Sequence, residues 1–260
     1  MDLIGYAFSY QAIFLLVVVL TLPVFVALAR IHATDIHFGR SCGAPDHHTL
    51  DRPARAGRAS LWKSPGLLVL AVCLFLFQLG NASMLPLAGE SLIYQRESLS
   101  SLVVSALIIL PQIVVAATAP WVGREANKLG RRPLLLIGLG ALPVLALLFA
   151  LVPEPQALLA FQLLDGVSGA VVGVLTALVI ADLTNGTGRF NLAQGLVGTA
   201  SGVGASLSTA LFGVIAASFG RTVVFLSIAA SALVAVLILW FLMPETRPAT
   251  KPVRLQIEHV

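Results

Sequence analysis

Charged residues are scarce in this sequence: they make up 11% of its 260 residues, whereas a soluble domain usually holds about 25%. Cysteine is scarce too, with Cys42 in a polar stretch and Cys73 in an apolar one, so no disulfide scaffold is expected. The N-terminus has neither a basic segment nor a small-residue cleavage site, which favours a retained first span over a signal peptide. With 58% hydrophobic residues, this composition indicates an integral membrane protein.

Several motifs of known chemistry are also absent. The last apolar stretch, 221–243, has no lysine that could form a retinal Schiff base. The sequence contains no His-Glu-x-x-His or Gly-Lys-Ser/Thr motif. We therefore expect a protein that is not an enzyme, needs no cofactor and binds no nucleotide. Because the basic residues lie in loops between apolar stretches, we expect them to determine membrane topology and not to bind nucleic acid.

Seven apolar stretches are each long enough to cross about 30 Å of hydrocarbon as a helix. Their predicted bounds are 10–29, 65–87, 99–121, 134–152, 155–181, 190–218 and 221–243. We therefore predict an all-α polytopic membrane protein with seven transmembrane helices. The chain is thereby divided into an N-terminal transmembrane helix (1–31), a cytoplasmic loop (32–64), a six-helix unit (65–245) and a cytoplasmic tail (246–260).

The basic residues are unevenly distributed among the connecting segments. Fourteen of the 16 Lys and Arg residues fall in segments that the seven-span order places on one side of the membrane. Only Arg96 and Arg221 are expected on the other side. The positive-inside rule makes the basic side cytoplasmic. We therefore expect a multi-pass protein of the cell (inner or plasma) membrane, with its N-terminus outside and its C-terminus in the cytoplasm.

One long polar loop, 32–64, separates the first span from the other six. Its His and Cys residues follow one another at steps of about five: His32, His37, Cys42, His47 and His48. A metal site is one interpretation, because His and Cys bind transition metals. Five-residue steps do not place side chains on one helix face, however. We therefore interpret the segment as a largely disordered, solvated linker without a metal.

A short basic segment at 123–133 reads Gly-Arg-Glu-Ala-Asn-Lys-Leu-Gly-Arg-Arg-Pro. Lys and Arg at this density are expected outside the bilayer. Gly123 and Gly130 permit backbone angles that other residues avoid, and Asn127 is suited to hydrogen-bond a nearby backbone group or helix end. Pro133 fits the first turn of the next helix. We predict a tight turn here.

The pattern Gly-x-x-x-Asn-Lys-x-Gly-Arg-Arg resembles the signature loop of the major facilitator superfamily, a large class of secondary transporters. The matching residues are Gly123, Asn127, Lys128, Gly130, Arg131 and Arg132. The family usually has Asp where this chain has Asn127; the amide keeps the hydrogen bonds but lacks the charge, so a charge-relay role does not transfer. The alternative interpretation is an ordinary positive-inside loop.

The resemblance implies twelve spans in two six-span halves joined by a long cytoplasmic loop. Here the signature loop lies between the second and third of the six spans after the long loop, where the family has its second copy. The chain thus resembles helices six to twelve: a C-terminal six-helix bundle plus one preceding helix. It is expected to be a truncated gene product, one part of a split transporter, or a remnant. Its expected partners are the lipid bilayer, a small-molecule substrate, and a separate N-terminal half or a second copy of itself.

The function that the resemblance implies is alternating-access transport of a small molecule, a drug or a metabolite, by ion-coupled export or exchange. The alternative is a half-transporter remnant or partner subunit that packs in the membrane without transporting.

Small residues four apart, at Gly169, Gly173, Gly198 and Gly202, predict closely packed helices.

Asp165 is the clearest functional candidate within a span. It lies ten residues after the start of the fifth span, roughly 15 Å deep at 1.5 Å per residue, where ionisable residues are costly. Such a carboxyl can hold a proton at neutral pH and release it when water arrives, which makes Asp165 the proton-coupling candidate; a structural acid is the alternative. The run from Gln162 to Gly166 resembles the family's Arg-x-x-Gln-Gly element, with Gln162 in place of Arg and Asp165 in place of Gln.

Amide side chains supply the cavity candidates. Gln78 and Asn81 lie three apart on the second span and share a helix face. By the resemblance, this span and the fifth line the central cavity, so both amides are expected to face one polar chamber with Gln162 and Asp165. Hydrogen bonds between helices are the alternative. Gln112 is a weaker candidate, because it follows a helical proline whose freed carbonyl it is able to satisfy.

Overall fold

The computed structural model describes residues 64–93, 100–152 and 155–246, together with six isolated positions within 19–30. The three continuous ranges contain five helices: α4 (Pro65–Ile93), α5 (Ser100–Leu129), α6 (Arg131–Leu151), α7 (Pro155–Thr184) and α8 (Phe190–Leu242). These ranges contain no strand, and each helix is long and apolar enough to cross a membrane. The all-helical class is therefore confirmed.

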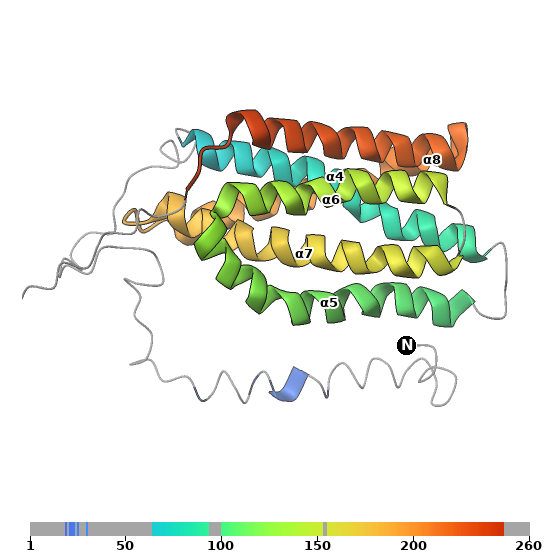
Figure 1. Ribbon diagram of the computed structural model, residues 1–260, viewed down its shortest axis with the longest axis horizontal. Helices are drawn as coiled ribbons and strands as arrows, with labels where there is room; N and C mark the ends of the chain where they lie inside the picture. Colours follow the sequence, from blue (N-terminus) through green and yellow to red (C-terminus); the bar gives the residue numbers. More distant parts are fainter. Residues whose placement is uncertain are drawn as a thin grey trace, which may run out of the picture.

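The predicted count of seven helices is not confirmed, because most of the first span, 10–29, lies outside the described residues. The predicted linker at 32–64, except for its last residue, lies outside them too, as does most of the predicted tail at 246–260. The domain bounds accordingly stay predictions. The described helices run side by side and roughly parallel, with α5 at one edge of the bundle and α7 beside it (Figure 1).

Helix α8 is two helices that meet at Gly220. Its 53 residues would extend about 80 Å at 1.5 Å per residue, more than twice the thickness of the hydrocarbon. The helical angles break only at Gly220, with φ 81° and ψ 177°, a conformation that glycine tolerates. The break falls between the predicted sixth and seventh spans, 190–218 and 221–243.

The two parts of α8 fold back on each other against α4. Gly204 packs on the backbone of Phe75 so closely that a Cβ there would collide with the Phe75 carbonyl oxygen. Two residues away on α4, the Cys73 Sγ lies 3.5 Å from the carbonyl oxygen of Ala235. Residues 204 and 235 are almost equally distant from Gly220, so the chain reverses at that glycine, as the red and orange parts of α8 show (Figure 1).

Contacts near the helix ends show that successive helices run in opposite directions. At one end, Gly66 of α4 packs against Leu183 of α7 and Pro244, which follows α8. At the other end, Phe149 of α6 lies 5.8 Å from Phe161 of α7 and 5.5 Å from Phe225 of α8, measured between ring centroids. The first end also carries the signature motif and is called the signature end below.

The signature motif differs from the predicted tight turn. Helix α5 continues through most of the motif to Leu129, and α6 starts at Arg131. Only Gly130 leaves the helical path, and its φ of 99° confirms that this position needs glycine. Gly123 is helical, so the expectation of unusual backbone angles there is wrong. The basic residues of the motif therefore lie on the ends of two helices and not in a loop.

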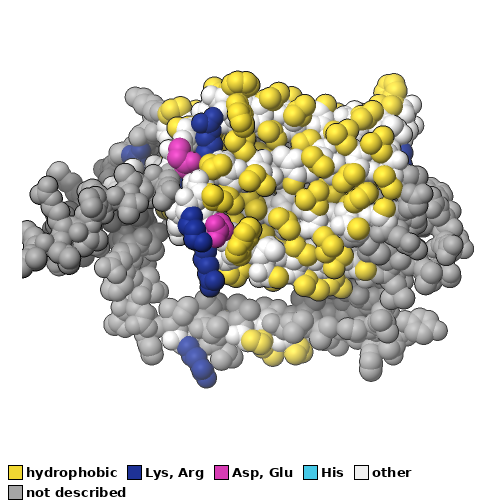
Figure 2. Space-filling view, in the orientation of Figure 1, with side chains coloured by type: hydrophobic (Ala, Val, Ile, Leu, Met, Phe, Trp, Pro, Cys, Tyr) yellow, Lys and Arg dark blue, Asp and Glu magenta, His cyan; other side chains and the backbone are white. Residues whose placement is uncertain are grey.

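The buried side chains form one apolar core between the helices. Leu70 of α4, Leu139 of α6, Leu175 of α7 and Phe225 of α8 are at most 1% exposed. The face shown in Figure 2 is also largely apolar, and the Lys, Arg, Asp and Glu side chains of the described residues on it gather mainly at the signature end. A protein with an apolar exterior and an apolar core suits hydrocarbon as its solvent.

Glycines make close contacts between helices at only some of the predicted positions. The Cβ position of Gly169 lies 3.5 Å from the Val115 side chain of α5, whereas that of Gly173 has no atom within 4 Å. A Cβ on Gly166 would lie 2.8 Å from the carbonyl oxygen of Pro111, so α7 and α5 approach closely there. Gly198 and Gly202, by contrast, have no atom within 4 Å of a Cβ position. These two glycines therefore do not bring two described helices close together.

Candidate functional site

Three of the four polar residues expected to face one chamber line the same pocket. The pocket has a volume of about 220 Å³ and is lined by residues of three helices, α4, α6 and α7. Its polar lining consists of Asn81, Gln162 and Asp165. Its apolar and small lining consists of Ala82, Met84, Leu85, Leu145 and Phe149. Because Phe149 lies near the end of α6, the pocket lies in the part of the bundle away from the signature end.

Gln162 is buried in the pocket wall without a partner for its oxygen. The residue is 3% exposed. Its Oε1 atom accepts no hydrogen bond from any described residue. Leaving a buried acceptor unpaired costs about 1–3 kcal/mol, so a group inside the pocket is expected to donate a hydrogen bond to it.

Asp165 follows Gln162 by three residues, which places both on one face of α7. Within the described residues no Lys or Arg forms an ion pair with it; the ion pairs found there join Lys128 to Glu125 and Arg131 to Asp182. The carboxyl is therefore available to a proton or to a bound ligand.

The other two cavity candidates lie elsewhere. Gln78 is half-buried and does not line this pocket. Gln112 is exposed on α5, and Pro111 beside it is buried against Gly166. The pocket thus holds Asn81, Gln162 and Asp165 and leaves these two amides out.

An aromatic cluster that the sequence did not reveal includes one residue of the pocket wall, Phe149. The Phe149 ring stacks on Phe225 and meets Phe161 edge to face. Arg221 fixes this cluster, because its Nη2 donates to the Phe149 carbonyl at 3.1 Å and its guanidinium lies 5.6 Å from the Phe225 ring centroid. The aromatic residues come from three separate helices, so only the fold reveals the cluster.

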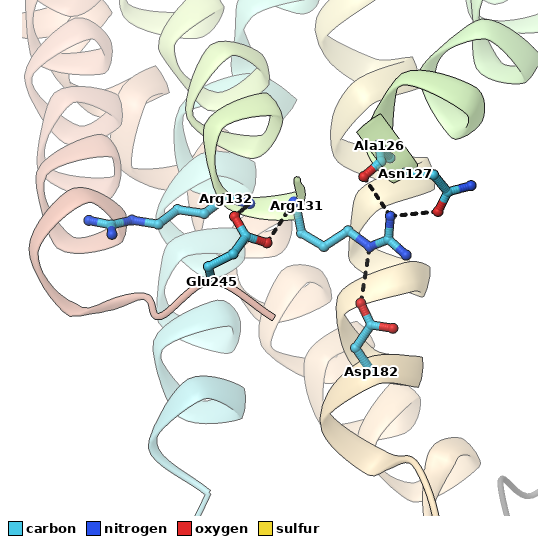
Figure 3. Close-up of polar contacts among 6 residues, drawn as sticks. All are labelled: Ala126, Asn127, Arg131, Arg132, Asp182 and Glu245. Atoms are coloured by element: carbon cyan, nitrogen blue, oxygen red, sulfur yellow. Dashed lines mark hydrogen bonds and ion pairs between the residues drawn. The ribbon is translucent and has the colours of Figure 1, made fainter. Parts of the chain in front are cut away.

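The signature end is held by a hydrogen-bonded cluster around Arg131 (Figure 3). The Arg131 Nε donates to Asp182 Oδ2 at 3.0 Å, and its Nη1 donates to the Ala126 carbonyl at 2.7 Å and to Asn127 Oδ1 at 2.9 Å. Asn127 thus accepts from a guanidinium; it does not cap a helix. The cluster joins α5, α6 and α7 through one buried side chain.

Glu245 adds the region after α8 to this cluster. Its carboxylate accepts hydrogen bonds from the backbone N–H of Arg131 at 2.8 Å and of Arg132 at 3.2 Å. These N–H groups belong to the first turn of α6 and have no partner within the helix. A negative charge there also interacts favourably with the helix dipole. Arg132 in turn donates to the Trp240 carbonyl near the end of α8.

Sequence reasoning missed both acids of the cluster. Asp182 carries a local signal: it lies in the last turn of α7, where the helix dipole disfavours an acid and a basic partner is expected. Glu245 carries none, because it lies 114 residues from Arg131 in the chain. The other signature residue, Lys128, is exposed and pairs with Glu125 at 2.7 Å.

No three His, Cys, Asp or Glu side chains gather into a possible metal site within the described residues.

Comparisons with known proteins identify the family of this chain. The family model of the Major Facilitator Superfamily matches residues 70–258, which is more than half of the chain. Uncharacterized MFS-type transporters of two Mycobacterium tuberculosis strains are 36% identical over 180 residues, covering 69% of this chain and 43% of theirs. The tetracycline resistance protein, class B, of Escherichia coli is 36% identical over 102 residues, covering 39% of this chain and 24% of its own.

The chain therefore belongs to the major facilitator superfamily, and it is a multi-pass membrane protein. It spans less than half the length of the curated relatives that it matches.

Proposed function

We propose that this chain, as a member of the major facilitator superfamily, forms one half of a secondary transporter that exports or exchanges a small molecule. The pocket that contains Asp165 and Gln162 carries the proposal. Ionisable residues within membrane spans are rare, and they mark the pathways of substrates and protons. The relatives are named as transporters, which supports the proposal that this chain takes part in transport and does not act as an enzyme.

Asp165 is the proposed coupling group. Its carboxyl lines a pocket and forms no ion pair with a described residue, so protonation breaks no structural contact. When the pocket opens to the side with the lower proton concentration, Asp165 releases its proton to water there. When it opens to the other side, Asp165 takes up a proton from the water on that side. A group of this kind links proton movement to a change of access.

The signature end is proposed to face the cytoplasm. Arg124, Lys128, Arg131 and Arg132 cluster there, and the positive-inside rule assigns such ends to the cytoplasmic side. The hydrogen bonds of Arg131 and the Glu245 cap join α5, α6, α7 and the region after α8 at this end. We propose that the cluster holds the half together as one rigid body while access alternates.

A second six-helix half is proposed to complete the transport path. In carriers of this type the substrate site lies at the interface of two repeats. The described helices provide one repeat, and α5 exposes Ile108, Ile109 and Ile113 on its surface. The second half is either another polypeptide segment or a second copy of this chain, related by an axis along the membrane normal.

Flux through reconstituted liposomes tests the proposed function. The 260-residue chain is reconstituted, its oligomeric mass is measured, and uptake of a set of drugs and metabolites is followed with and without an imposed proton gradient. Uptake that follows the gradient and comes only from a two-half assembly is expected. Flux that ignores the gradient would contradict the coupling, and flux from a strict monomer would contradict the second half.

A further inference from the structure

We propose that the pocket binds a compact organic ammonium ion, a primary amine with a small hydrocarbon body. The inference rests on the proposed function, because it names the substrate class of the same site. Its basis is the combination of an unpaired buried amide oxygen, a carboxyl and apolar walls in one pocket of known size.

The size of the pocket limits its occupant. A volume of 220 Å³ would hold roughly seven waters at about 30 Å³ each. Pockets for drug-sized ligands are usually about 300–1,000 Å³. The pocket therefore fits a small organic molecule better than a drug-sized one.

The polar groups of the pocket select for hydrogen-bond donors. Gln162 Oε1 is buried and lacks a donor among the described residues, and Asp165 is a second acceptor three residues further along α7. An ammonium group offers three N–H donors and a positive charge. It is therefore able to satisfy the Gln162 oxygen and neutralise the Asp165 carboxylate at the same time. Asn81 provides a third polar contact from α4.

The apolar walls exclude a fully hydrated cation. Met84, Leu85, Leu145 and Phe149 line the rest of the pocket. A sodium ion needs oxygen ligands on all sides, and these four side chains supply none. A hydrocarbon body, by contrast, gains free energy by leaving water for such a surface. The rings of Phe161 and Phe225 hold Phe149 in place, so the wall is already formed before a ligand arrives.

All eight lining residues lie on α4, α6 and α7 of this chain, which provides one wall of the proposed transport path. Binding is therefore expected in the chain alone, whereas transport needs the second half. The chain is placed in lipid nanodiscs, and isothermal titration calorimetry measures the binding of benzylammonium at neutral pH. Empty nanodiscs correct for partition into lipid. Benzyl alcohol, which has the same hydrocarbon body and no charge, is the matched ligand.

We expect one saturable benzylammonium site per chain and at least tenfold weaker binding of benzyl alcohol. Asp165→Asn is expected to weaken benzylammonium binding at least tenfold, and Gln162→Leu at least threefold. Glu125→Gln and Gln194→Leu are the matched controls, because both residues lie outside the pocket. The affinity of each control variant for benzylammonium is expected to stay within twofold of the wild-type value. Ala82→Val narrows the pocket and keeps all three polar groups, so it is expected to weaken binding of the amine by steric exclusion.

Equal affinity for the alcohol and the ammonium would overturn the proposal, as would unchanged benzylammonium binding in a folded Asp165→Asn variant. Saturable sodium binding that depends on Asp165, without benzylammonium binding, would assign the pocket to a metal cation instead. If the variants do not fold, the wild-type comparison of the two ligands still decides. Benzylammonium binding without flux of any compound would refute the proposed transport and leave this inference intact. Flux without amine binding would refute this inference and leave the proposed transport intact.

Discussion

The Nε atom of Arg131 lies 3.0 Å from Oδ2 of Asp182, and the two side chains are only 6% and 13% exposed. Arg131 comes from the signature motif at the start of α6, and Asp182 comes from the last turn of α7. A buried pair of this kind adds little net stability compared with an apolar pair, but removing one partner leaves the other charge buried and unpaired. The pair therefore makes the signature motif a structural joint between helices.

Removal of the Arg131 charge is expected to destabilise the folded bundle. Arg131→Leu should lower the free energy of unfolding by about 3–5 kcal/mol, because Asp182 is left without its partner. Arg131→Leu combined with Asp182→Leu should cost less than the sum of the single changes. Reversible unfolding in mixed detergent micelles measures the three values. Additive losses of stability in the double variant would show that the two residues are not coupled. The control is Lys128→Ala, which removes an exposed ion pair and should change the free energy of unfolding by about 0.5 kcal/mol or less.

A second prediction concerns the two glycines of the signature motif. Gly130→Ala should destabilise the bundle by about 1–2 kcal/mol, because φ is 99° and a Cβ would lie 2.8 Å from a Glu245 carboxylate oxygen. Gly123→Ala is the matched control: Gly123 is helical, with open space at its Cβ position, so alanine should stabilise by up to about 1 kcal/mol. Thermal unfolding of both variants measures the difference. Equal effects at the two sites would refute the left-handed backbone at Gly130.

A third prediction concerns the contact between α8 and α4. Gly204→Ala should destabilise the protein by about 1–3 kcal/mol, because the new methyl group meets the Phe75 carbonyl and the helices have to separate. Gly202→Ala, two residues away with open space, should be neutral or slightly stabilising. Unfolding midpoints of the two variants provide the comparison. A tolerated alanine at Gly204 would contradict the close helix approach.

A fourth prediction concerns the orientation in the membrane. A reporter fused after Val260 should lie in the cytoplasm, and one inserted at 94–99 should lie outside, because the basic residues cluster at the signature end. Paired alkaline phosphatase and fluorescent protein fusions report the two sides. An external reporter after Val260 would reverse the assignment.

The sequence predicted the helical class and the apolar stretches, because hydrocarbon requires long runs of apolar residues that are visible locally. It also separated the last two spans between 218 and 221, where Gly220 leaves the helical path, and it singled out Gly130 for its backbone freedom. It placed the end of the third span at 121, whereas α5 continues to Leu129, because the polar residues of the motif hide its helical continuation.

The candidate site was predictable only in part. Asp165, Gln162 and Asn81 stand out as polar residues in apolar stretches, and the structure brings them to one pocket. The third wall, Leu145 and Phe149 of α6, consists of apolar side chains that resemble every other core residue in the sequence. Glu245 was missed because its partner N–H groups lie more than a hundred residues away and belong to the backbone.

Proton movement across liposomes tests the central claim, coupling through Asp165, most directly. The assembled protein is reconstituted in liposomes with an internal pH-sensitive dye, and a transported compound is added outside. The account predicts that the compound moves protons in the wild type and that Asp165→Asn abolishes this movement, whereas Glu125→Gln leaves it unchanged. Proton movement that persists in a correctly inserted Asp165→Asn protein would contradict the account.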